Sequence, residues 1–341
     1  MELLNRKKTG KVERPVKVLQ FGEGNFLRAF VDYMIDIANE QGKFNGDIVL
    51  VKPIEFGSLD RFHDQECQYT VQLRGIVDGE PKRINRIVTS VADAVDAYGE
   101  YQKYADYAKL DSLRYIVSNT TEAGIVYDDT DRLEMEPPKS YPGKLTKFLY
   151  ERYKHFNGAM DKGLVMLPVE LIDDNGIHLK ECVEKLAVLW NLEDGFKTWL
   201  DEACVFTSTL VDRIVTGYPR DEAEELCKEF GYQDNLIVTG EPFALWVIES
   251  AKDISKEFPL PDAGLPVIFT DNQKPYKQRK VRILNGAHTS FVLASYLCGN
   301  DIVLESMQDE LIFNFMKATI FDEVIPTLTL PKQDLIDFAD S

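Results

Sequence analysis

Histidine and cysteine are scarce in this 341-residue sequence, and neither is spaced as a metal site requires. The five cysteines are odd in number and contain no Cys-x-x-Cys pair, which predicts free thiols in a reducing compartment. There is also no His-Glu-x-x-His motif, so we expect no metal site. The four histidines are scattered through the chain: His63, His155, His178 and His288.

Long apolar runs and an excess of positive charge are also missing. No run approaches the roughly 20 apolar residues of a membrane helix, and the polar, basic N-terminus is unlike a signal peptide. Acidic residues outnumber basic ones by 57 to 39, which gives a net charge of -18. This charge argues against nucleic acid or an anionic membrane as a partner. We therefore expect a cytoplasmic protein, in which an anionic substrate requires a local basic pocket.

The sequence contains neither a Gly-x-x-x-x-Gly-Lys phosphate loop nor a Gly-x-Ser-x-Gly nucleophile motif. With 44% hydrophobic and 28% charged residues, its composition is that of an ordinary globular protein. Its length is sufficient for two domains, and the basic stretch that follows Asp271 suggests residues 1–272 and 273–341. Nothing in the sequence indicates the oligomeric state.

The N-terminal part begins with a strand, a glycine turn and a helix. An apolar strand pattern over 16–21 runs directly into Gly22-Glu-Gly24 and then into a helical pattern. This is the context of a dinucleotide fingerprint, in which the glycines permit a sharp turn and the helix N-terminus receives a pyrophosphate. Leu27 occupies the place of the usual third glycine, and a plain strand-turn-helix is the competing interpretation. The expected cofactor contacts are Phe21, Gly22, Glu23, Gly24, Asn25, Phe26, Leu27 and Arg28.

Two further strand patterns end in polar turns, where a Rossmann-type sheet binds its cofactor and substrate. After the strand over 47–51, Glu55 is placed to bind an adenosine ribose, whereas Lys52 would suit a 2′-phosphate. After the strand over 115–118, Asn119 and Glu122 are candidates for cofactor or substrate contacts. A solvated loop and ordinary turn chemistry are the alternative explanations.

The remaining pattern alternates strands and helices as far as residue 271 and is mainly helical afterwards. A hairpin is expected around Asp78-Gly79, and a buried strand over 209–215 contains the neighbours Asp212 and Arg213, which we expect to form an ion pair. The fold class predicted is α/β, with an N-terminal doubly wound parallel sheet followed by a helical domain.

The stretch over 280–298 has apolar residues almost all round a helical wheel, which predicts a buried helix. At about 100° per residue, His288 and Asn285 lie roughly 80° and 140° from Lys280. An ammonium, an amide and an imidazole on one arc of a buried helix indicate a site, although each alone is explained by backbone partners. Burial lowers the pKa of a lysine, which suits proton transfer near neutral pH.

Taken together, the motifs resemble the mannitol dehydrogenase family of long-chain polyol dehydrogenases. No single motif is specific to this family, but the combination of all of them in this order is. The resemblance extends over nearly the whole chain. The motifs lie at 18–29, 118–124, 170–176 and 209–220, followed by Lys280-x4-Asn285-x2-His288.

The resemblance implies a Rossmann-type domain, a helical domain, NAD as cofactor and no metal. It also implies that Lys280 is the general acid/base, that Asn175 and Asn285 hold the oxyanion, and that His288 assists. By its pattern alone, the Asn175-Gly176 pair is an ordinary turn.

The substrate that the resemblance implies is a small sugar acid, tagaturonate, reduced to altronate. Fructuronate and a polyol such as mannitol are the alternatives, and Arg28 or Arg213 are candidates for the substrate carboxylate. A nicotinamide-binding protein without catalysis and a Schiff-base lysine at position 280 are rival interpretations. The chain ends at Ser341 as a helical pattern begins, whereas the family continues, so we expect an incomplete C-terminal domain.

Overall fold

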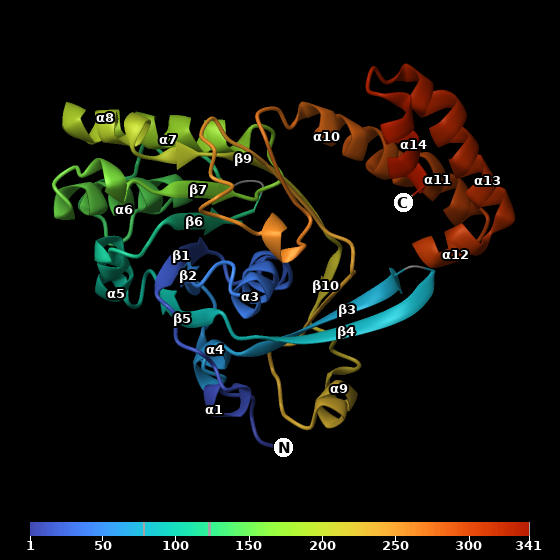
Figure 1. Cartoon of the computed structure of the whole chain (residues 1–341), viewed down its shortest axis with the longest axis horizontal. Coiled ribbons are helices and arrows are strands. Elements are labelled where there is room, and N and C mark those ends of the chain that lie inside the picture. The colour runs from blue at the N-terminus through green and yellow to red at the C-terminus, as the bar shows by residue number, and fades with distance from the viewer. Residues whose placement is uncertain (78, 122–123, 341) are drawn as a thin grey trace. The chain divides into compact units, whose positions relative to one another are not determined.

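The computed structural model describes residues 1–77, 79–121 and 124–340 (Figure 1). The chain divides into two compact units, Met1–Asp271 and Asn272–Ser341. This division lies within one residue of the boundary expected from the sequence.

The centre of the first unit is a six-stranded parallel sheet with the strand order β5-β2-β1-β6-β7-β8. In the middle of this sheet, Leu19 of β1 is paired with Val49 on one side and Ile116 on the other. All six residues of β2 are buried, as expected of a parallel strand covered on both faces. The strands are β1 (Val16–Phe21), β2 (Asp47–Lys52), β5 (Val91–Asp96), β6 (Tyr115–Ser118), β7 (Val165–Pro168) and β8 (Val205–Phe206).

Helices cover both faces of this sheet. Alternate residues of β1 belong to different cores, because successive side chains of a strand point to opposite faces. Val18 belongs to the core that contains residues of η1 and α3, whereas Leu19 packs in the core of α6, α7 and α8. The α/β fold with a doubly wound sheet is therefore confirmed. The helices are α2 (Asn25–Leu27), η1 (Arg28–Asp32), α3 (Tyr33–Glu40), α6 (Tyr141–His155), α7 (Asn175–Leu189) and α8 (Asp194–Glu202).

Two smaller sheets complete the first unit. The strands of the four-stranded sheet are, in order, β10 (Val215–Gly217), β11 (Val238–Gly240), β3 (Tyr69–Val77) and β4 (Glu80–Val88), with β3 and β4 forming the expected hairpin (Figure 1). Those of the three-stranded sheet are β13 (Val267–Thr270), β12 (Leu245–Glu249) and β9 (Ser208–Asp212). The expected strand over 209–215 is thus divided between two sheets. Short helices complete the unit: α1 (Arg6–Thr9), α4 (Asp60–Asp64), α5 (Tyr101–Asp106), η2 (Tyr107–Lys109), η3 (Met160–Lys162), α9 (Ala223–Phe230) and η4 (Pro261–Ala263).

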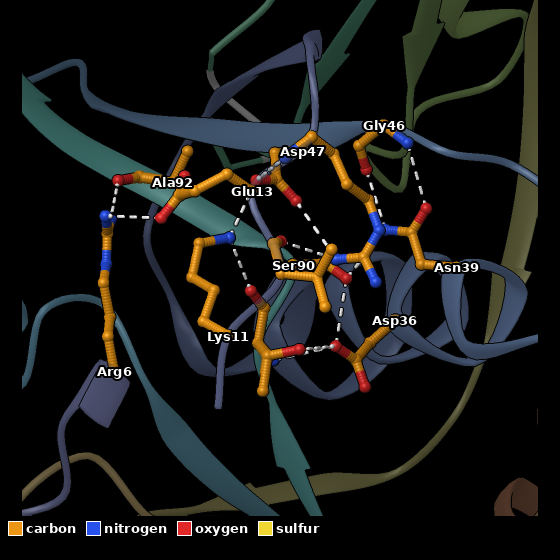
Figure 2. Close-up of polar contacts among 12 residues, drawn as sticks. Arg6, Lys11, Glu13, Asp36, Asn39, Gly46, Asp47, Ser90 and Ala92 are labelled. Atoms are coloured by element: carbon orange, nitrogen blue, oxygen red, sulfur yellow. Dashed lines mark hydrogen bonds and ion pairs between the residues drawn. The ribbon is translucent and has the colours of Figure 1, made fainter. Parts of the chain in front are cut away.

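The first 15 residues, the polar and basic N-terminus, are held against the sheet by buried polar contacts (Figure 2). The Lys11 ammonium lies 2.7 Å from an Asp47 carboxylate oxygen, and both side chains are fully buried. Lys11 also donates to the carbonyl of Thr89 at 2.8 Å, and Asp36 accepts from the Thr89 N–H at 2.8 Å. Because a buried ion pair is costly to break, this network fixes the position of the N-terminal segment.

The second unit is helical, and two of its segments are π-helical. Its elements are α10 (Lys274–Arg279), the π-helix η5 (Lys280–Asn285), α11 (Gly286–Leu297), α12 (Val303–Gln308), α13 (Glu310–Ala318), the π-helix η6 (Thr319–Val324), η7 (Ile325–Thr327) and α14 (Lys332–Asp340). Its core is formed around Ile283, Ile320, Ile325 and Leu335.

The expectation that the helix over 280–298 is buried is wrong. Ile283, Phe291 and Ser295 are buried, but Leu293 and Leu297 remain 75% and 86% exposed. An all-round apolar pattern leads to burial only where other elements surround the helix, and the small core of this unit covers one side of it. Among the helices that the structure describes, none is long and apolar enough to span a membrane.

Asp32 is a fully buried carboxyl group at the end of η1, and it generates a testable prediction about pH. Burial raises its pKa to about 7, although Tyr69 donates a hydrogen bond to it at 2.6 Å. The folded protein therefore retains a proton that the unfolded chain releases near pH 4. The retained proton stabilises the folded protein. This stabilisation is fully present below pH 4 and is lost as the pH rises through 7.

We expect Asp32→Asn, which resembles the neutral acid, to become more stable relative to the parent protein as the pH rises from 4.5 to 8. Where the two proteins differ by one bound proton on unfolding, the difference in their free energies of unfolding should grow by about 1.4 kcal/mol per pH unit. Urea unfolding of both proteins at the two pH values measures it. Asp36→Asn is the control, because breaking the 2.7 Å pair with Arg86 should destabilise at both pH values. An identical pH dependence for Asp32→Asn and the parent would refute the role of Asp32.

Candidate functional site

The turn after β1 lies where the strand order of the large sheet reverses. Gly22 has φ +119°, and a Cβ there would lie 3.2 Å from both the Asn119 carbonyl oxygen and Leu27 Cδ1. The Gly22 N–H donates to Val51 O at 2.9 Å, and the Asn119 N–H donates to Phe21 O at 3.1 Å. The turn is therefore held between the ends of β2 and β6, the position at which doubly wound sheets bind ligands.

The helix that follows has an open N-terminus. Gly24 is its N-cap, makes no side-chain capping bond and is exposed, and a Cβ placed on it would meet nothing within 4 Å. The first backbone N–H groups of this helix are thus accessible to an anion. Leu27, in place of the third glycine, is buried against Gly22. The residues present therefore fit the pyrophosphate of a dinucleotide.

Arg28 is buried, and each of its three guanidinium nitrogens donates a hydrogen bond within the protein. It is only 6% exposed, and burial lowers its pKa. Its guanidinium donates to Glu23 O at 3.2 Å, to Asn25 Oδ1 at 2.7 Å and to Leu236 O at 2.5 Å. These bonds connect the turn to the segment at Leu236, and the expected roles of Arg28 as a cofactor contact and as a candidate for the substrate carboxylate stay predictions.

Arg213, the other candidate for the substrate carboxylate, is bonded within its own unit in the same way. It is 8% exposed, and burial lowers its pKa to about 10. It donates to three backbone carbonyls at 2.6–3.0 Å, those of Ala29, Pro242 and Phe243. These bonds, and not the expected ion pair with Asp212, account for its burial.

The remaining side chains of the turn differ in exposure. Glu23 is half-buried, and burial raises its pKa. Asn25 is exposed, and Phe26 is half-buried and stacks on Phe30 with ring centroids 5.0 Å apart. Phe21, at the end of β1, is fully buried. Glu23 and Asn25 are thus the polar side chains that can reach a ligand at this turn.

Lys52 shapes the loop after β2. Its side chain is 1% exposed and lies 3.0 Å from the Asp96 carboxylate. Its ammonium also donates to three carbonyls of this loop at 3.0–3.3 Å, those of Ile54, Glu55 and Phe56. No donor remains for a 2′-phosphate, so that alternative is wrong. Glu55 is exposed, and its backbone is held beside the end of β2.

The turn after β6 is joined to the end of β7 by a buried carboxylate. Glu170 is 2% exposed and accepts hydrogen bonds from Ser118 Oγ at 3.1 Å and from both the N–H and Oγ1 of Thr120 at 3.0 and 2.9 Å. Burial raises its pKa. Asn119 is half-buried between these groups and Gly22. Glu122 lies outside the described residues.

Asn175 is fully buried, and its amide is entirely occupied by the backbone. Its Oδ1 accepts from the N–H groups of Gly176 and Thr209, both at 2.9 Å. Its Nδ2 donates at 3.0–3.1 Å to three carbonyls, those of Pro168, Glu170 and Thr209. An amide with two N–H bonds has no capacity left for a substrate oxygen. The geometry gives Asn175 a structural role in place of the expected oxyanion role.

In the second unit, a π-helical turn brings together the other three candidates. The Gly286 N–H bonds back to Val281 O, five residues earlier, so Lys280 and Asn285 lie over one another. His288 follows Asn285 by three residues on α11 and shares its face. The arc that contains Lys280, Asn285 and His288 is therefore narrower than a regular α-helix predicts. Lys280 is half-buried and the other two are exposed, so the premise of full burial is wrong.

The His288 ring is oriented by its own helix. Its Nδ1 lies 3.0 Å from Leu284 O, and because a carbonyl only accepts, Nδ1 carries the hydrogen. In the neutral imidazole, Nε2 is then an acceptor. The ring also packs against Phe291, with centroids 5.8 Å apart. Lys280 and Asn285 can donate, and His288 can accept, on one face.

These positions lead to a test that separates structural from catalytic asparagines. We expect Asn175→Ala to lower the free energy of unfolding by about 2–4 kcal/mol, because five backbone partners lose their bonds in a buried site. Asn285→Ala, at an exposed position, should change it by less than about 0.5 kcal/mol. Urea unfolding of the two variants checks both values. Equal stability of the two variants would contradict the structural role of Asn175.

Family comparisons cover both units. The model described as the mannitol dehydrogenase Rossmann domain matches residues 16–261, and the one described as the mannitol dehydrogenase C-terminal domain matches residues 272–341. Proteins named altronate oxidoreductase match along the whole chain. Those from Phocaeicola vulgatus and Pectobacterium atrosepticum are 44% and 47% identical over 340 and 342 residues, which is 100% of this chain and 71% and 70% of theirs.

Two solved structures share the fold. Mannitol 2-dehydrogenase of Pseudomonas fluorescens, solved with NAD and D-mannitol, has a TM-score of 0.77 at 23% identity and covers 99% of this chain and 74% of its own. A substrate-free D-sorbitol dehydrogenase has a TM-score of 0.80 at 21% identity, covering 99% and 75%. From the two family models and these relatives, we conclude that the chain belongs to the mannitol dehydrogenase family and is a dehydrogenase.

Proposed function

We propose that this protein is an NAD-dependent reductase that interconverts tagaturonate and altronate. The support is the 44–47% identity, over the whole chain, to relatives named altronate oxidoreductase. The observation that carries the chemistry is the common face of Lys280, Asn285 and His288 created by the π-helical turn.

The turn from Gly22 to Asn25 is proposed to bind the pyrophosphate of NAD. Bound NADH would supply the hydride to the substrate ketone. Glu55 is proposed to accept a hydrogen bond from the adenosine ribose, as an acidic residue after the second strand does in NAD-binding sheets. Because Lys52 is occupied, nothing in its position favours the additional phosphate of NADP.

On the second unit, each polar group has a proposed role in proton transfer. The Lys280 ammonium donates a proton to the alkoxide that forms from the ketone, and takes it back in the oxidising direction. The amide of Asn285 donates a hydrogen bond to the same oxygen as its charge develops. His288 Nε2 accepts a hydrogen bond from the neighbouring substrate hydroxyl, because its Nδ1 hydrogen is already bound to Leu284 O.

Substrate identity is tested by the loss of NADH absorbance with tagaturonate, fructuronate and fructose. We expect the highest kcat/KM with tagaturonate. A preference for fructuronate would indicate a related reductase, and a preference for fructose would indicate a polyol dehydrogenase. No turnover of any of the three with bound NADH would refute the proposal.

Replacing the proposed acid tests the chemistry separately from cofactor binding. We expect Lys280→Ala to reduce kcat by at least about a hundredfold, because no other group on that face donates the proton. NADH binding, followed by fluorescence titration, should be unchanged. The control is Lys317→Ala, which removes a lysine of α13 whose ammonium lies over Phe321. Near-normal turnover by Lys280→Ala would show that the assignment is wrong.

A methyl group at Gly24 tests the cofactor turn. Because nothing in the protein approaches within 4 Å of this Cβ position, Gly24→Ala should keep its melting temperature within a few degrees. The same methyl group would obstruct a pyrophosphate, so we expect the Kd for NADH to rise about tenfold or more. An unchanged Kd would place the pyrophosphate elsewhere.

A further inference from the structure

The start of the second unit is a concentrated basic segment in an acidic protein. Residues 274–282 contain five cationic side chains among nine residues and no acidic one, although the chain has a net charge of -18. These five residues are Lys274, Lys277, Arg279, Lys280 and Arg282. Such a segment supplies the local positive potential that an anionic substrate needs against the repulsion of the whole protein.

The other arginines considered for this purpose are already occupied. Arg28 and Arg213 are less than 10% exposed, and each donates to acceptors in its own unit, mostly backbone carbonyls. A residue that holds a substrate carboxylate must instead retain an uncompensated charge and a fixed orientation.

Arg279 has both properties. Its guanidinium carbon lies 4.5 Å from the ring centroid of Phe338 and 5.6 Å from that of Tyr276, so two aromatic rings fix its orientation. Within the described residues it forms no ion pair, and its Nε is buried without a hydrogen-bond acceptor. A guanidinium stacked on a ring keeps the Nη edge available for the two parallel hydrogen bonds that a carboxylate accepts.

Arg279 also directly precedes the proposed acid. It is the last residue of α10, and Lys280 is the first residue of η5. Adjacent helical residues point about 100° apart, so the long Arg279 side chain flanks the face of Lys280, Asn285 and His288. A hexuronate carries its ketone and its carboxylate on one short chain and can reach both positions.

We propose that Arg279 binds the carboxylate of the sugar-acid substrate and thereby sets the preference for acids over neutral polyols. This inference rests on the proposed function and adds to it the residue that recognises the substrate class. Lysine at this position keeps the charge but loses the planar pair of donors, so it retains only part of the preference.

The test is calorimetric titration of the NADH-loaded protein with D-altronate and with altritol, its uncharged analogue. We expect the parent protein to bind altronate more tightly. Arg279→Met, which keeps the apolar contact with Phe338, should lower this preference about 10- to 100-fold and leave altritol affinity unchanged. Arg279→Lys should lie between the two, and Arg282→Met is the control, because Arg282 is exposed on the same segment.

Retention of the full preference by Arg279→Met would overturn the inference, as would a parent protein that binds the two ligands equally or binds neither. If Arg282→Met lost as much of the preference for altronate over altritol, the preference would come from net charge, and the role of Arg279 would also be overturned. A parent protein that prefers altronate through Arg279 but does not oxidise NADH with tagaturonate would refute the proposed function and keep this inference.

Discussion

The close approach of two backbones at Gly22 is the constraint on which the first unit depends. Its positive φ turns the chain from β1 into the first helix, and the Asn119 carbonyl leaves no room for a side chain. A tight turn at this point directs the N-terminus of that helix toward the edge where the strand order reverses. The open space around Gly24 exists because Gly22 makes the sharp turn.

Buried cations support the loops around this edge. Lys52, Arg28 and Arg213 donate mainly to backbone carbonyls of the surrounding segments. Arg152 does the same before β6 and β7, where it donates to the carbonyls of Ala108 and Lys162. Each of these loops would otherwise leave carbonyls without donors in the interior. A single guanidinium, with five N–H bonds, satisfies several carbonyls at once.

Much of the fold could be predicted from the sequence because its patterns are local. The strand over 16–21, the glycine turn and the helix after it follow from apolar periodicity and glycine chemistry. The division of residues 209–215 between β9 and β10 could not be predicted, because it depends on the pairing of β9 with β12 and of β10 with β11. The exposure of the helix at 280–298 does not follow from its periodicity, because periodicity records apolar faces and not the elements that cover them.

The candidate site shows the same limit at the level of side chains. Residue type indicates what a group can do, but the partners that occupy it depend on contacts distant in the sequence. Asn175 contacts Thr209, 34 residues away, and Arg28 contacts Leu236, 208 residues away. Neither contact follows from spacing, so the sequence alone does not reveal the backbone partners of these two residues. The contact of Arg279 with Phe338, which is remote in the chain, does not follow from spacing either.

The π-helical turn at Lys280–Asn285 decides how the polar groups of this segment face one another. A wide turn holds one residue more than the regular helix on either side of it. If the same residues formed a regular helix, Lys280 and Asn285 would lie about 140° apart and would point to different sides. The helix would remain continuous, and Ile283 could still pack in the core of the unit. A change in the pitch of one turn is therefore enough to separate the ammonium from the amide without unfolding the segment.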